Sequence, residues 1–174
     1  FISAFYNSLL TLISYNDIII INNTNEIMEE KIMTCTFFGH SDTPPTVRGQ
    51  LKDTLITLIE TRGADLFYIG NHGGFDRMAE GVLRELSAVY PHIKYYVVLA
   101  YLPTKPGNSP TLFPEGVETV SKRFAINFRN KWMVENSDLI VAYVNRSYGG
   151  AQQFTALAER RKKRIINLAP NAEQ

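Results

Sequence analysis

The chain has 174 residues, of which 45% are hydrophobic, and its formal net charge is +1. This length suits one ordinary domain with a sizeable core, and the balanced charge gives no overall field that would favour nucleic acid or a membrane surface as a partner. The single cysteine, Cys35, excludes an intramolecular disulfide and a zinc site built from cysteines. Because Cys35 stands in an apolar run, we expect a buried thiol, which fits a cytoplasmic protein.

Residues 1–32 differ in composition from the rest of the chain: they are rich in Phe, Ile, Asn, Ser and Tyr, and they do not begin with Met. Asn7, Asn16 and Asp17 interrupt this apolar stretch, whereas a membrane span needs about 20 predominantly apolar residues in a row. We therefore expect an N-terminal extension of doubtful structure and no membrane anchor. The Ile-rich run at 18–21 could form one strand or part of a hairpin.

From Met33 onward, short apolar stretches alternate with stretches of helical spacing. Val47, Leu51, Leu55 and Leu58, for example, recur at the spacing of one helix face. The expected strands are apolar throughout, which is typical of parallel strands covered on both faces. In chain order we expect a strand at 34–39, a helix at 46–63, a strand at 64–70, a helix at 74–91, a strand at 93–100, a proline-rich loop at 101–117, a helix at 118–137, a strand at 138–144, a helix at 149–163 and a strand at 164–169.

This order predicts one α/β domain over residues 33–170. Right-handed crossovers between the strands make it a Rossmann-like three-layer α/β/α sandwich with a mainly parallel sheet.

Glycines and polar residues follow the carboxyl ends of the expected strands, which is where such sheets bind ligands. The three stretches read GHSD at 39–42, GNHGGFD at 70–76 and NRSYGGA at 145–151. The last two place paired glycines directly before a helix, and the free backbone N–H groups of a helix N-terminus favour an anion. The pattern predicts turns that cradle a phosphate. The alternative is that the glycines only form tight turns and allow close packing of helix on sheet.

The stretches FFGHSD, GNHGGFDRMA, RFAINFRNKWMVENSDLIVAYV and YGGAQQFTALA resemble the SLOG superfamily. That superfamily unites the Lonely-guy phosphoribohydrolases, the DNA-processing proteins and small YpsA-like bacterial proteins, and the resemblance is strongest to the last group. It covers residues 33–168. It implies a Rossmann-like fold that binds a nucleotide or a nucleotide-derived ligand.

The sequence departs from the enzymes of that superfamily at two positions. Arg129 matches the Arg of their Arg-Lys pair, but Asn130 replaces the Lys, and Gln153 falls where their catalytic Glu is expected. Gln cannot supply a carboxylate for acid–base work. The resemblance therefore implies binding or sensing of a nucleotide-like ligand without efficient turnover. The alternative is a phosphoribohydrolase-like hydrolase with a non-standard set of residues, and no catalytic residue is assigned.

The candidate ligand-binding residues are either glycines of these turns or polar residues at the ends of the strands and on the helices that follow. They are Gly39, His40, Gly70, Asn71, Gly73, Gly74, Asp76, Arg129, Tyr148, Gly149, Gly150 and Gln153.

Some of these candidates have a plain structural alternative. Asp76 could hold a ribose hydroxyl or a ligand amine, or it could only complement the dipole of its helix. Arg129 could contact an anion or form a surface salt bridge. His40 and His72 match no metal-binding spacing, so we expect no metal ion and no cofactor.

The run ERRKKR at 159–164 looks like a basic patch, but we expect a solvated helix end. A nucleotide-like small molecule is therefore the expected partner and nucleic acid is not. Whether the chain forms a homo-oligomer stays open.

Overall fold

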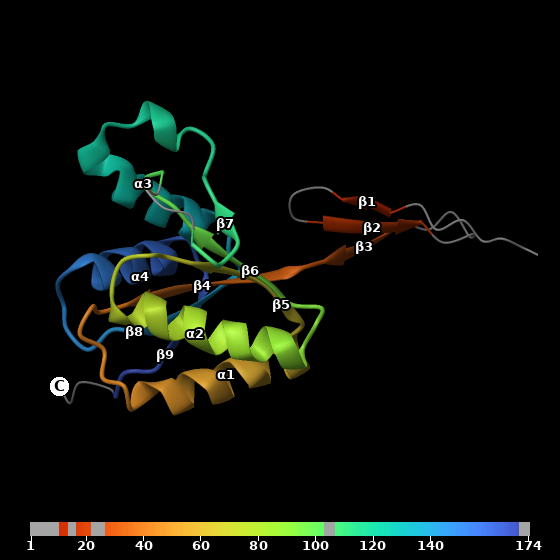
Figure 1. Cartoon of the computed structure of the whole chain (residues 1–174), viewed down its shortest axis with the longest axis horizontal. Helices are drawn as coiled ribbons and strands as arrows, with labels where there is room; N and C mark the ends of the chain where they lie inside the picture. The colour runs from red at the N-terminus through yellow and green to blue at the C-terminus, as the bar shows by residue number, and fades with distance from the viewer. Residues whose placement is uncertain (1–10, 14–16, 22–26, 103–106, 171–174) are drawn as a thin grey trace, which may run out of the picture. The chain divides into compact units, whose positions relative to one another are not determined.

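The computed structural model describes residues 11–13, 17–21, 27–102 and 107–170, and the chain separates into two compact units, Phe1–Ile32 and Met33–Gln174. In the first unit, the strands β1 (Thr11–Ile13), β2 (Asp17–Ile21) and β3 (Ile27–Lys31) pair antiparallel in that order (Figure 1). The Ile-rich run thus forms the middle strand of a small sheet.

The second unit is built on a six-stranded sheet in the order β7-β6-β5-β4-β8-β9, in which all the pairs are parallel. The strands are β4 (Met33–Gly39), β5 (Ala64–Ile69), β6 (Lys94–Val98), β7 (Thr111–Leu112), β8 (Leu139–Tyr143) and β9 (Arg164–Asn167). All five residues of β8 are buried, as are most of those in β4 and β5. Their continuous apolar character follows from this burial on both faces. Cys35 is 1% exposed in β4, which confirms the predicted buried thiol.

Helices cover both faces of this sheet (Figure 1). The helices are α1 (Val47–Arg62), α2 (Gly74–Val89), α3 (Lys122–Glu135) and α4 (Gly150–Arg160). α1 packs beside α2 on one face, and α3 packs beside α4 on the other. The predicted Rossmann-like α/β sandwich is therefore confirmed. Among the described residues, no helix combines the length and apolar character that crossing a membrane requires.

The strand order creates a crevice beside the central strand β4. From β4 the chain adds β5, β6 and β7 on one side, then returns to place β8 and β9 on the other side. The order reverses between β4 and β8, so the loops that leave their carboxyl ends turn toward opposite faces of the sheet. In open α/β sheets this reversal point is where ligands bind.

The proline-rich stretch differs from its prediction as one long loop. Its described part contains the two-residue strand β7 and a 3-10 helix, η1 (Val117–Thr119), so that α3 begins only at Lys122. β7 is held beside β6 by hydrogen bonds from Val97 N–H to the Pro110 carbonyl and from Leu99 N–H to the Leu112 carbonyl. Two residues are too short to show any periodicity, which is why the sequence did not reveal this edge strand. Part of the predicted loop, residues 103–106, lies outside the described residues.

Candidate functional site

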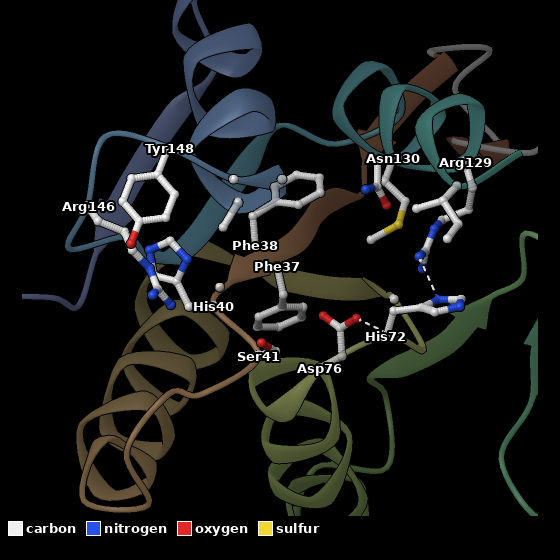
Figure 2. A pocket seen from close by; sticks show the side chains of 17 residues that line it. Phe37, Phe38, His40, Ser41, His72, Asp76, Arg129, Asn130, Arg146 and Tyr148 are labelled. Carbon is white, nitrogen blue, oxygen red and sulfur yellow. Dashed lines mark hydrogen bonds between the residues drawn. The ribbon is translucent and has the colours of Figure 1, made fainter. Parts of the chain in front are cut away.

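A pocket of about 390 Å³ opens at the carboxyl ends of β4 and β8 (Figure 2). Its walls come from the loop after β4, the loop after β5, one face of α3 and the turn that leads into α4. The predicted residues that line it are Gly39, His40, Gly70, Asp76, Arg129, Tyr148, Gly149 and Gly150. The predicted residues outside its lining are Asn71, Gly73, Gly74 and Gln153.

The N-terminus of α4 forms one wall of the pocket. Gly149, Gly150 and Ala151 line it, and no side chain caps the helix. The first turn of a helix leaves backbone N–H groups without partners inside the helix, and together with the helix dipole they attract an anion. A Cβ atom at Gly149 or Gly150 would meet no atom within 4 Å, so this turn is open. Gly149 has φ 94°, a left-handed conformation that favours glycine.

Arg146 stands next to this turn. Its guanidinium pairs with the exposed Asp42 carboxylate of the loop after β4, and it lies over the Tyr148 ring at 5.5 Å from the ring centroid. Together these contacts place a cation at the rim of the pocket. Arg146 is not among the residues predicted from the sequence. The sequence feature that could have revealed it is a basic residue three positions before a glycine pair at the start of a helix.

His40 lies on the same side of the pocket as Arg146 and Tyr148 (Figure 2). His40 is 6% exposed, and its Nε2 atom has no hydrogen-bond partner among the described residues. Burial lowers the pKa of His40, and the nearby charge of Arg146 lowers it further. The ring is therefore neutral at pH 7. A buried polar atom without a partner costs free energy that a bound ligand group could recover.

Arg129 occupies the opposite side of the pocket. It is 1% exposed, so its alternative interpretation as a surface salt bridge is wrong. Its Nη1 donates to the Val98 carbonyl at 3.1 Å, and its Nη2 lies 3.2 Å from Nδ1 of His72. Because a guanidinium only donates, Nδ1 of His72 must accept this bond and the ring is neutral. Burial and the charge of Arg129 both lower the pKa of His72, in agreement with that assignment.

Asp76 lies beside Arg129 and is 9% exposed. Its Oδ2 accepts the backbone N–H of His72 at 2.9 Å. Burial raises the pKa of Asp76 from its ordinary 3.8 to about 6, although Arg129 and the His72 N–H act in the opposite direction. A Cβ atom at Gly70 would lie 2.4 Å from Asp76 Oδ2 and 2.6 Å from Arg129 Nη1. A side chain at position 70 would therefore force the ends of these two charged side chains to move.

Gly73 and Gly74 serve a contact within the protein. The N–H of Gly74 donates to the Ser41 carbonyl at 3.0 Å, and a Cβ atom at Gly74 would lie 2.4 Å from that oxygen. Gly73 has φ 121°, which again favours glycine. These two glycines bring the start of α2 against the loop after β4. This contact agrees with the alternative prediction, in which the glycines allow close packing instead of binding a phosphate.

Of the α3 residues that line the pocket, only Arg129 was predicted from the sequence as a ligand-binding residue. Ile126, Arg129, Asn130 and Met133 line the pocket at the spacing of one helix face, which places two polar and two apolar side chains on it. The described residues contain no group of three His, Cys, Asp or Glu side chains that could hold a metal ion.

The chain matches no protein-family model, and a search of curated proteins finds no match either. A solved structure that it resembles is DNA processing protein A (DprA) from Streptococcus pneumoniae, with a TM-score of 0.57 and 11% sequence identity. The match covers 77% of this chain and 49% of that one, so this chain spans about half the length of DprA. At this identity the likeness shows the fold alone. It supports the predicted Rossmann-like α/β fold.

Proposed function

We propose that this chain binds or senses a nucleotide or nucleotide-derived ligand in the pocket, without efficient turnover, as a small YpsA-like member of the SLOG superfamily. The ligand's phosphate lies against the N-terminus of α4, between Arg146 and His40. The resemblance of the sequence motifs to that superfamily supports the nucleotide-like character of the ligand.

The observation that carries this proposal is the open first turn of α4. It lines the pocket, no side chain caps it, and apart from the neighbouring backbone no described protein atom lies within 4 Å of a Cβ position at Gly149 or Gly150. The charge of Arg146 at the rim and the unpaired, buried Nε2 of His40 lie on the same side of the pocket. A phosphate there would receive backbone hydrogen bonds and a charged partner at once.

The absence of turnover is inferred from the side chains around the pocket. Gln153 is exposed and lies outside the lining. Among the described residues that line the pocket, Asp76 is the only acidic one. Glycosidic cleavage ordinarily employs an acid–base carboxylate that is correctly placed at the reacting bond.

A second candidate function rests on Asp76 itself. Its carboxyl group is buried on the pocket wall with a pKa of about 6, close to the range in which a carboxyl group can both give and take a proton near neutral pH. A hydrolase of the phosphoribohydrolase type would depend on this residue. Release of free base from a nucleotide, lost in Asp76→Asn, would favour this candidate over the first.

The test of the phosphate position compares Gly150→Asp with Gly150→Asn. Both side chains enter space that holds no atom within 4 Å of the Cβ position, and an Asp at the start of a helix is favourable for the helix itself. The Asp carboxylate should repel a phosphate at α4 and weaken binding of adenosine 5'-monophosphate about tenfold or more relative to Asn. Isothermal titration calorimetry measures this difference. Equal affinities of the two variants would contradict the proposed position.

A further inference from the structure

Asp76 and Arg129 are two buried charged residues whose place in the pocket the proposed phosphate site does not explain. In Figure 2, His40, Arg146 and Tyr148 lie to the left of the pocket, and Asp76, Arg129 and Asn130 lie to the right. One side therefore carries groups that attract an anion. The other side carries a carboxylate together with a guanidinium that already donates to the Val98 carbonyl and the His72 ring.

The pair is built into the fold rather than left over at its surface. Asp76 is 9% exposed and Arg129 is 1% exposed. Two hydrogen bonds, to the Val98 carbonyl and to the His72 ring, hold the guanidinium in place, and the His72 N–H holds one oxygen of the carboxylate. In their observed positions the ends of both side chains occupy the space that a Cβ atom at position 70 would need. Packing alone would be served better by apolar side chains, because burying charge is costly.

The Asp76 carboxylate can accept a further hydrogen bond from a ligand. Oδ2 of Asp76 accepts the His72 N–H, whereas its other oxygen, Oδ1, accepts no hydrogen bond from the described residues. An ionised carboxylate accepts hydrogen bonds and donates none, so the ligand group that meets it must be a donor. Asn130, the next residue on α3, also lines the pocket and adds an amide that can both donate and accept.

We infer that Asp76 accepts hydrogen bonds from the sugar hydroxyls of a ligand whose phosphate lies at α4, so that the pocket selects ribose phosphates over deoxygenated analogues. This inference rests on the proposed function, because it needs the phosphate at the opposite side of the pocket. Hydroxyl groups suit the position because they are neutral donors that can also accept a bond from the Asn130 amide. The pocket then matches one ribose phosphate. Its phosphate meets the hydrogen-bond donors at α4, and its two hydroxyls meet Asp76 and Asn130.

The test measures binding of two nucleotides to the full chain by isothermal titration calorimetry at about pH 8, where Asp76 is ionised. Adenosine 5'-monophosphate carries both ribose hydroxyls, and 2',3'-dideoxyadenosine 5'-monophosphate carries neither. The parent should bind the first about tenfold to a hundredfold more tightly, since a hydrogen bond to a charged group is lost in the second. In Asp76→Asn this preference should fall to less than about threefold.

The outcomes separate this inference from the proposal on which it rests. Equal affinity of the parent for the two nucleotides overturns the inference while leaving phosphate binding intact. This comparison needs no variant, so it stands even if Asp76→Asn fails to fold. A preference that survives in a folded Asp76→Asn protein assigns the hydroxyl contact to another residue and overturns the role of Asp76. If neither nucleotide binds, the proposed function is wrong and the inference falls with it.

Discussion

The stability of Asp76→Asn relative to the parent should rise as the pH rises. Asp76 is 9% exposed, and burial raises its pKa from 3.8 to about 6, against the opposing effects of Arg129, the His72 N–H and Arg77. A carboxyl group whose pKa is higher in the folded state binds its proton more tightly there than in the unfolded state. The folded state is therefore favoured while Asp76 is protonated. That advantage is lost as the pH rises through the window between 3.8 and about 6.

The magnitude follows from the same two pKa values. One pKa unit corresponds to about 1.4 kcal/mol, so the rise from 3.8 to about 6 corresponds to about 3 kcal/mol of unfolding free energy lost above the window. Asn has nearly the shape of the protonated carboxyl group and does not ionise. Between about pH 4 and about pH 8, the stability of Asp76→Asn should shift by about 2–3 kcal/mol in its favour relative to the parent.

Urea unfolding, followed by circular dichroism at several pH values, measures this shift. The difference between variant and parent cancels the titration of groups that both proteins share. The attraction between the ionised Asp76 and Arg129 is already contained in the Asp76 pKa of about 6, so the pH-dependent difference reports the net effect of the carboxylate. Asp53→Asn, at an exposed position on α1, is the matched control and should show no comparable shift. A difference that stays constant with pH, or that moves in favour of the parent, would refute the reasoning.

Three further predictions concern the glycine turns, the division of the chain and its chemistry. Gly74→Ala should lower the unfolding free energy by about 1–3 kcal/mol, because its Cβ would lie 2.4 Å from the Ser41 carbonyl oxygen. Gly150→Ala is the control and should not destabilise the protein. Equal effects of the two substitutions in urea unfolding would contradict the packing role of Gly74. The fragment Met33–Gln174 should fold by itself, since it forms a separate compact unit with its own core, and a fragment without cooperative thermal unfolding would show otherwise. The parent and Gln153→Glu should both release no adenine from adenosine 5'-monophosphate, because position 153 is exposed and lies outside the pocket lining. Chromatographic detection of free adenine with either protein would contradict this prediction.

The order and type of the elements in the second unit followed from the sequence because these features depend on near neighbours. The helix α1 is visible in the spacing of Val47, Leu51 and Leu55, all of which are buried, and Gly63 ends it in the left-handed conformation at φ 64°. Apolar strands separated by helices are enough to predict a parallel sheet covered on both faces. The same local information fails at β7, which is two residues long and exists only because β6 lies beside it.

The sequence by itself determined that the polar residues and glycines gather at the carboxyl ends of parallel strands. Only the tertiary structure decided which of them share one pocket. The contact between Arg146 and Asp42 joins residues 104 positions apart in the chain, and no local spacing encodes it. The two glycine turns look alike in sequence, yet the Ser41 carbonyl fills the space beside Gly74, whereas the space beside Gly150 is open. Arg129 reads as a surface residue of a mixed helix, but it is buried because the strand order places the end of β6 and the loop after β5 beside it.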